Sequence, residues 1–204
     1  MRITQFSESV PKKVEEALQE LKEKEVEGLI LDLRNNSGGL VSSGIAVADS
    51  LLSEKPVVET KDRNGIKDAI ISQKETSFDG PMVTLVNKGT ASASEILAGS
   101  LQDNERSILM GEQTYGKGLI QSLKSLGEDS GIAITVASYL TPKGNNIQGQ
   151  GMTPDKLLDL PEASDYGSTD DKWLKIAELF LGSLLEKEDV SVQTIELNNE
   201  EINL

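Results

Sequence analysis

A cluster of small and hydroxyl-bearing residues lies near the middle of the chain, between an apolar run at 82–86 and a helix-like segment at 96–101. The apolar run predicts a short buried strand, so Ser92 and Ala93 fall where a strand turns into a helix. Backbone N–H groups at a helix start are unpaired and carry partial positive charge. A serine placed there can act as a nucleophile, because these amides stabilise the oxyanion that its attack creates. On this stretch alone the simpler interpretation is a helix cap, made by Thr90 or Ser92.

The absence of two residue types limits the chemistry that such a serine could use. The chain contains neither His nor Cys. A Ser-His-Asp triad, thiol chemistry and disulfides are therefore excluded, and a zinc site would have to use carboxylates alone. We expect no metal and no cofactor. A nucleophilic serine must take Lys, Glu, Asp or Tyr as its base.

The overall composition predicts a globular protein. The chain has 204 residues, enough for one core and an appendage, with 26% charged and 37% hydrophobic residues. The formal net charge of −14 argues against binding to nucleic acid, which requires basic patches. No apolar run is long enough to span a membrane, and the N-terminal residues do not read as an export signal.

Strand-like and helix-like segments alternate along the chain, which predicts an α/β architecture. The expected strands are 2–6, 28–33, 57–60, 67–72, 82–86, 108–110, 119–126 and 131–140. Helices are expected after Ser9, with Pro11 in the first turn, and at 41–52 and 96–101. Turns are expected at 63–65 and 127–131.

The composition changes near residue 161. Residues 162–169 are polar and read as a linker, and 171–185 form an amphipathic pattern that is followed by an acidic tail. The apolar stripe of this predicted helix comprises Trp173, Ile176, Ala177, Phe180 and Leu184. We expect the stripe to pack on the main body or on another subunit. The predicted organisation is a catalytic domain at 1–160 and a linker, C-terminal helix and tail at 161–204.

A second glycine-rich turn follows the predicted strand at 28–33. It contains Gly38 and Gly39 and precedes the helix-like segment 41–52, so its backbone amides could approach a ligand closely. It is not a P-loop, because no Gly-Lys-Ser/Thr ends it. A simple turn is the alternative interpretation.

Three segments together, 32–39, 89–96 and 111–121, resemble the carboxyl-terminal processing peptidases, also called tail-specific proteases. The resemblance covers about 2–159 and looks closest to the branch that trims the photosystem II reaction-centre precursor. It implies an α/β fold of the crotonase/ClpP-like type, built of repeated strand-strand-helix units. It also implies a serine endopeptidase with a Ser-Lys dyad that cleaves the C-terminal tails of protein substrates.

By position within these segments, the resemblance implies that Ser92 is the nucleophile and Lys117 the general base. Gln121 resembles the polar residue that orients the lysine, and the amides of Gly38 and Ala93 resemble the oxyanion hole. The residues alone leave Ser94 as a rival nucleophile, although Ser94 also suits a bond to the backbone at the helix start.

The proposed base must be uncharged, whereas a free lysine is almost entirely protonated at neutral pH. Burial would favour the neutral amine, and the nearest acidic residue, Glu112, would have to be engaged elsewhere. A straight strand through Lys117 would keep Gln121 too far away for a hydrogen bond. We therefore expect a bend at 116–118.

Members of this family usually carry a helical region and a peptide-binding PDZ domain before the catalytic part, and we expect both to be missing from this chain. The resemblance implies export to the periplasm or the thylakoid lumen and leaves room for a homo-oligomer. Two alternatives remain open. One is a catalytically weak or inactive peptide-binding fragment of such a protease, and the other is crotonase-type acyl-CoA chemistry on the same fold.

Overall fold

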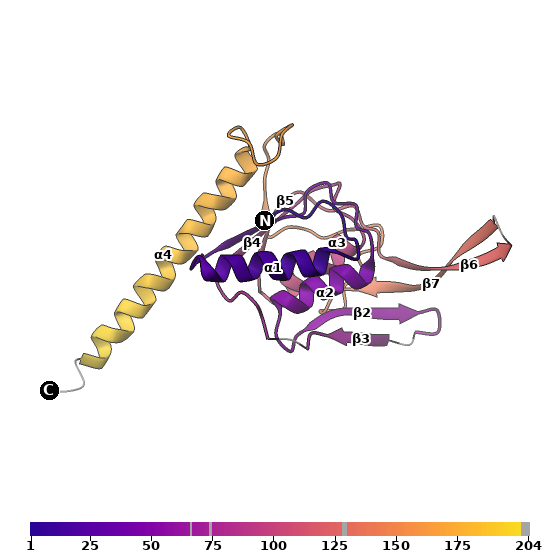
Figure 1. Cartoon of the computed structure of the whole chain (residues 1–204), viewed down its shortest axis with the longest axis horizontal. Coiled ribbons are helices and arrows are strands. Elements are labelled where there is room, and N and C mark those ends of the chain that lie inside the picture. The colour runs from indigo at the N-terminus through magenta and orange to yellow at the C-terminus, as the bar shows by residue number, and fades with distance from the viewer. Residues whose placement is uncertain (66, 74, 128–129, 201–204) are drawn as a thin grey trace.

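The computed structural model describes residues 1–65, 67–73, 75–127 and 130–200. Within these residues the chain forms two four-stranded sheets and four helices. A long C-terminal helix extends from one side of the body, and a β-hairpin projects on the opposite side (Figure 1). The α/β architecture expected from the sequence is present, with one parallel and one antiparallel sheet.

The parallel sheet contains β1 (Leu29–Asp32), β4 (Met82–Val86), β5 (Ile108–Gly111) and β8 (Lys156–Leu157), in the order β1-β4-β5-β8. Strands β1, β4 and β5 are almost continuously apolar because both faces of the sheet are covered there. Neighbouring residues alternate between two hydrophobic clusters, so Met82 and Val86 face one cluster while Val83 and Leu85 face the other.

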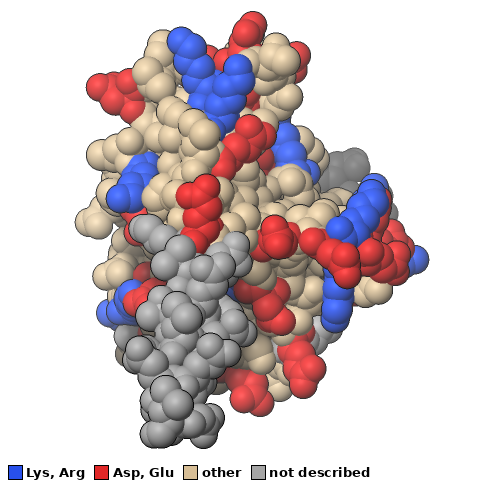
Figure 2. Space-filling model, turned by 90° about the vertical axis from the view of Figure 1, so that its left-hand side faces the viewer, with Lys and Arg blue, Asp and Glu red and all other residues tan. Residues whose placement is uncertain are grey.

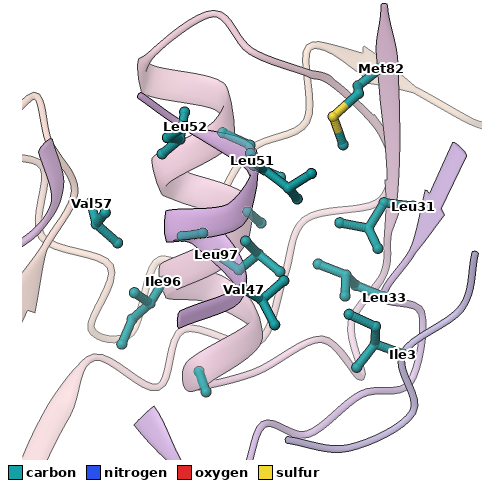
Figure 3. Packing of buried hydrophobic residues seen from close by; sticks show 14 of the residues in the cluster. Ile3, Leu31, Leu33, Val47, Leu51, Leu52, Val57, Met82, Ile96 and Leu97 are labelled. Atoms are coloured by element: carbon teal, nitrogen blue, oxygen red, sulfur yellow. The ribbon is translucent and has the colours of Figure 1, made fainter. Parts of the chain in front are cut away.

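Three helices cover the first face of this sheet: α1 (Val10–Glu23), α2 (Val41–Leu51) and α3 (Ala93–Asp103). Figure 3 shows Leu31 and Leu33 of the β1 segment directed toward Val47 of α2 and Leu97 of α3. All four side chains are fully buried. This core fixes the N-terminal ends of α2 and α3, which lie next to the two glycine- and serine-rich turns.

The C-terminal helix α4 (Lys172–Glu200) covers the second face. Its buried residues Trp173, Ala177 and Leu181 pack against Val83 and Leu85 of β4. The amphipathic stripe predicted from the sequence therefore contacts the main body. The helix continues to Glu200, well beyond the predicted end at 185, and the last four residues of the expected acidic tail lie outside the described residues.

The antiparallel sheet contains β2 (Pro56–Asp62), β3 (Lys67–Ile71), β6 (Leu119–Gly127) and β7 (Ser130–Leu140), in the order β3-β2-β7-β6. The β6–β7 pair forms the projecting hairpin of Figure 1. The turn expected at 127–131 includes 128 and 129, which lie outside the described residues.

Two short pairings differ from the sequence prediction. Residues 2–6 were expected to form a strand, but only Arg2 and Phe6 make isolated bridges, to Asp32 and Gly39. The two-residue strand β8 was not expected, because two residues show no periodicity. Both depend on contacts with segments that are distant in the sequence.

Candidate active site

Ser92 lies at the N-terminus of α3 in a strained backbone conformation. Its φ of +58° is uncommon for a residue other than glycine, and its side chain is half-buried. The preceding turn is held by Thr90, whose hydroxyl donates to the carbonyl of Leu33 at 2.9 Å and whose N–H donates to the carbonyl of Asn87. The strain at Ser92 therefore persists because both sides of the turn are anchored.

The rival serine, Ser94, is fully buried and donates its hydroxyl to the backbone carbonyl of Asn36 at 2.9 Å. This contact joins the start of α3 to the turn that precedes α2. A buried hydroxyl with a backbone acceptor has a structural role at the helix start, as one reading of the sequence suggested.

Glu95 connects the turn of Ser92 to the loop of Lys117. Its buried carboxylate accepts from the N–H of Ser92 and the N–H of Lys117 through Oε2, both at 2.8 Å. Through Oε1 it accepts from the Thr114 hydroxyl and the Gly116 N–H, both at 2.6 Å. An ionised carboxylate is an acceptor only, so it suits four donors. Two motifs far apart in the sequence thereby meet at one carboxylate.

Lys117 lies in a loop rather than in a strand. Gly116 has a φ of +88°, and a side chain there would collide with the backbone of Gln150 and Gly151. Strand β6 begins only at Leu119, so the backbone departs from an extended conformation just before Lys117. The Lys117 side chain is exposed, in contrast to the burial that its proposed role favours.

The acidic residue nearest to Lys117 in the sequence is engaged elsewhere, as expected. Glu112 forms an ion pair with Lys88 at 3.4 Å between Oε2 and Nζ. Gln121 is exposed on β6, next to an irregularity in the pairing at Ile120. Among the described residues, Gln121 makes no hydrogen bond to Lys117, so the orienting role of Gln121 stays a prediction.

Gly38 packs directly against the serine turn. Its φ is +100°, and an added Cβ would lie 2.8 Å from Cβ of Ser92 and 3.1 Å from the backbone nitrogen of Ala93. Only glycine fits here. The two amides predicted for an oxyanion hole are therefore neighbours.

The two amides differ in what they bond. The Gly38 N–H donates to Oδ1 of Asn36 at 3.0 Å, within its own turn. For the Ala93 N–H, the described residues provide no acceptor. As the first residue of α3, Ala93 presents this free N–H at the positive end of the helix dipole.

A buried ion-pair network lies behind the Gly38 turn. Arg34 is fully buried and makes paired hydrogen bonds to Asp32, at 2.9 and 2.8 Å, and to Asp171, at 2.9 and 2.7 Å. Burial works to lower the pKa of Arg34, but the bonds from both carboxylates outweigh it and raise the pKa above its usual range.

Opposing effects of burial and hydrogen bonding also act on the pKa of Asp171. Burial works to raise its pKa, but the bonds from Arg34 and from the N–H groups of Gly167 and Leu174 prevail and lower the pKa to about 2. Tyr166 stacks on Arg34, with 4.4 Å from the guanidinium carbon to the ring centre. Burial, with the hydrogen bond to Glu162, raises the pKa of Tyr166 to about 12.

The connections among the candidate site residues come from the tertiary structure. The spacing of Ser92 and Glu95 is that of a capping box, and the bond from the Ser92 N–H to the Glu95 carboxylate is present. Nothing in the sequence indicated that it also holds Lys117. Arg34 and Asp171 are 137 positions apart, so no local pattern could have paired them.

An open hollow beside the site offers room for a bound chain. It has a volume of about 580 Å³ and is lined by 5–9, Gly39 and Leu40. A hydroxyl at a helix start, an amine on the adjoining loop and two neighbouring amides together suit acyl transfer. Among the described residues no group of three or more acidic side chains could hold a metal ion.

Comparison with known proteins agrees with this chemistry. The model of peptidase family S41 matches residues 1–158, and the chain belongs to this family. It is a relative of the C-terminal processing proteases. It is 50% identical over 161 residues to the carboxyl-terminal-processing protease of Synechocystis sp., covering 79% of this chain and 38% of that protein.

Two further relatives are also named as C-terminal processing enzymes. The chloroplastic C-terminal processing peptidase of Tetradesmus obliquus is 45% identical, with 78% of this chain and 34% of that protein covered. The solved structure of a photosystem II D1 C-terminal processing protease superposes with a TM-score of 0.74 at 43% identity, covering 78% of this chain and 41% of that one. The chain thus spans well under half of the length of these relatives.

Proposed function

We propose that this chain carries the catalytic part of a serine endopeptidase that cleaves the C-terminal tails of protein substrates through a dyad of Ser92 and Lys117. The observation that supports this most strongly is the shared carboxylate of Glu95, which bonds the backbone N–H groups of both residues. Family membership supports the reaction class, and the names of the relatives support tails as the substrate.

The reaction begins at the Ser92 hydroxyl. Its oxygen attacks the carbonyl carbon of the scissile peptide while the neutral amine of Lys117 accepts the hydroxyl proton. The resulting tetrahedral intermediate collapses, the peptide C–N bond breaks, and the protonated lysine returns a proton to the departing amine. Water, activated by the now neutral lysine, then hydrolyses the acyl-enzyme and regenerates the serine.

The amides of Ala93 and Gly38 receive the negative charge of the tetrahedral oxygen. Ala93 offers an N–H that already lies free at the positive end of α3. The Gly38 N–H exchanges its present acceptor, Oδ1 of Asn36, for the oxyanion when substrate is bound. Strong stabilisation requires donors that are fixed beforehand, which the tight packing of Gly38 on Ser92 provides.

The exposed Lys117 side chain must lose water before it can act as a base. A substrate chain lying over the loop would cover the amine and favour its neutral form. The loop that carries Lys117 is anchored at its backbone by Glu95, whereas its side chain is free to turn toward Ser92. Gln121 would orient the amine only after such a movement.

Several broader features belong to the same proposal. The fold corresponds to the crotonase/ClpP-like type, with a catalytic domain at 1–160, and tail recognition by the whole protein relies on a separate peptide-binding domain. Export to the thylakoid lumen or the periplasm, which the resemblance implies, belongs to the same proposal, and relatives named as chloroplastic support a location in the chloroplast.

The described residues include no helix long and apolar enough to cross a membrane. Figure 2 shows acidic side chains spread among basic ones on one face, in keeping with the net charge of −14 and with protein substrates rather than nucleic acid.

A fluorophosphonate probe tests the dyad directly, because it labels only an activated serine. We expect labelling of the chain that disappears in Ser92→Ala and falls at least ~100-fold in Lys117→Ala. Ser37→Ala and Lys88→Ala are the matched controls, since both remove an exposed side chain of the same type nearby. Labelling that survives in Ser92→Ala would refute the proposal.

The same assay separates the alternatives. The exposed Lys117 favours a second candidate, a peptide-binding piece that is inactive by itself. A folded wild-type chain that binds an apolar tail peptide but never reacts with the probe would support it. Stabilisation by acyl-CoA in a thermal melt would instead revive crotonase-type chemistry.

A further inference from the structure

We propose that residues 162–171, which we call the clasp, position two turns for the reaction. One is the oxyanion turn, 34–39, which contains Gly38, and the other is the serine turn, 87–92, which ends at Ser92. The clasp acts through Arg34 and Asn35 on one turn and through Asn87 on the other, and it touches neither the substrate nor the reacting atoms. This proposal rests on the proposed function of Ser92 and Gly38. The sequence suggested only a polar linker for this segment.

The first connection consists of the two paired contacts that Arg34 makes with carboxylates. Its guanidinium is clamped between Asp32, at the end of β1, and Asp171, at the end of the clasp. Each carboxylate accepts two hydrogen bonds from the guanidinium, which fixes the direction of the arginine side chain. Since Arg34 begins the turn that leads to Gly38, the clamp sets where this turn starts.

Asp171 also connects the clasp to the start of α4. The same carboxylate accepts from the N–H of Leu174 at 3.1 Å and from the N–H of Gly167 at 2.9 Å. It therefore caps the helix and closes the clasp on itself. Helix α4, packed on the sheet through Trp173, gives the clasp a rigid support.

The second connection runs through Tyr166 and Glu162. The amide of Asn35 donates to the Tyr166 hydroxyl at 2.6 Å, and this hydroxyl donates to Glu162 at 2.7 Å. Glu162 in turn accepts from the amide of Asn87 at 2.7 and 3.0 Å. Asn35 and Asn87 also bond each other directly, so the clasp spans the starts of both turns.

These anchored turns lead directly to the proposed oxyanion donors. Asn36, next to Asn35, accepts from the Ala91 N–H through its carbonyl at 3.0 Å and from the Gly38 N–H through its side chain. Asn35 itself has a φ of +55°, an unfavourable conformation that its hydrogen bonds maintain. Loss of the clasp would allow Asn35 to relax and would shift Gly38 relative to Ser92.

The test uses substitutions that keep the helix cap and break the paired contact with Arg34, together with the bond from the Gly167 N–H to the same carboxylate. Asn and Ser cap helices about as well as Asp, so Asp171→Asn and Asp171→Ser should retain α4. Asp170→Asn is the matched control, because it removes an exposed acidic residue one position earlier. Leu181→Ala is a stability control that weakens the packing of α4 beyond the clasp and removes none of the clasp's own hydrogen bonds.

Two readouts are measured well below the melting temperature. The first is the fluorophosphonate labelling rate, which we expect to fall ~10-fold or more in both Asp171 variants and to stay within ~2-fold in both controls. The second is amide hydrogen exchange at 34–39, expected to be faster in the Asp171 variants alone. Tyr166→Phe should cause a smaller fall in labelling rate and a smaller rise in exchange at 34–39, because it keeps the ring and loses the two hydrogen bonds of the hydroxyl.

The outcomes divide cleanly. Unchanged exchange at 34–39 in Asp171→Asn would overturn the proposal, and so would faster exchange with a wild-type labelling rate. An equal loss of rate in Leu181→Ala would show a general stability effect and would also overturn it. If the wild-type chain does not label at all, the proposed function fails, while faster exchange at 34–39 would still support the clasp.

Discussion

The backbone N–H groups of Ser92 and Lys117 donate to one oxygen atom, Oε2 of Glu95, at 2.8 Å each. A buried acceptor shared in this way fixes the serine turn relative to the lysine loop without using either functional side chain. The hydroxyl and the amine remain available for chemistry. The backbones of the two proposed dyad residues are thus linked through one carboxylate.

Replacing Glu95 by Gln should weaken the connection between the turn of Ser92 and the loop of Lys117. The amide is similar in size but presents one oxygen to four donors, which leaves buried N–H groups without an acceptor. We expect the labelling rate to fall by about 10- to 100-fold and the free energy of unfolding to drop by about 3 kcal/mol. Probe kinetics and urea denaturation measure the two effects.

Glu112→Gln serves as the control for this change, because Glu112 forms only a partly exposed ion pair with Lys88. Its substitution should cost less than about 1 kcal/mol and leave labelling unaltered. Equal behaviour of the two variants would contradict the bridging role of Glu95.

Removing the Ser94 hydroxyl tests which serine reacts. Ser94→Ala deletes one hydrogen bond to the carbonyl of Asn36, and we expect a loss of about 1 kcal/mol in stability. The rate of probe labelling should stay within ~5-fold of wild type, since the hydroxyl is buried and engaged. Complete loss of labelling in a folded Ser94→Ala protein would transfer the nucleophile to Ser94.

A methyl group at Gly38 should block the site by direct collision. The added Cβ would lie 2.8 Å from both Cβ of Ser92 and the carbonyl oxygen of Ala91, so one turn must move. We expect labelling to fall at least ~100-fold, as for loss of an oxyanion donor.

Gly65→Ala provides the comparison for Gly38. Gly65 has a φ of +81° but no atom within 4 Å of the added carbon, so it shares the backbone strain without the collision. Gly65→Ala should cost about 1 kcal/mol of stability and leave labelling intact. A Gly38→Ala protein that labels like Gly65→Ala would argue against an oxyanion hole at this turn.

Acid should weaken the clasp only at a pH lower than that at which less strongly paired carboxylates are protonated, because the pKa of Asp171 is depressed. The folded pKa of Asp171, about 2, lies below the ordinary value of 3.8, so the ionised form stabilises the fold above pH 4. This contribution, about 2 kcal/mol, is complete at pH 6 and disappears as the pH falls from 4 to 2.

Urea denaturation of the wild type and of Asp171→Asn at pH 6, 4 and 3 measures this effect. The difference in stability between the two proteins should narrow with acid. A difference that stays constant from pH 6 to pH 3 would show that Asp171 is not held ionised by Arg34.

Local patterns predicted the secondary structure well where periodicity or turn chemistry was strong. The run at 82–86 became β4 with the same limits, and the segment at 41–52 became α2 with an end one residue earlier. The prediction failed at 2–6 and at β8, where pairing consists of isolated or two-residue contacts. Such contacts gain their stability from partners elsewhere in the chain, which no local window contains.

The amino-acid types alone excluded a histidine base and a thiol nucleophile, and the resemblance of three segments to a known family implied that Ser92 and Lys117 could take their place. Side-chain chemistry and helix starts are local properties, so the sequence sufficed for both. Only the tertiary structure decided that Glu95 bridges Ser92 to Lys117 and that Asp171 pairs with Arg34. Burying a charged group or an N–H without a hydrogen-bond partner is costly in free energy. The partner is therefore whichever complementary group the fold places nearby, however far away it lies in the sequence.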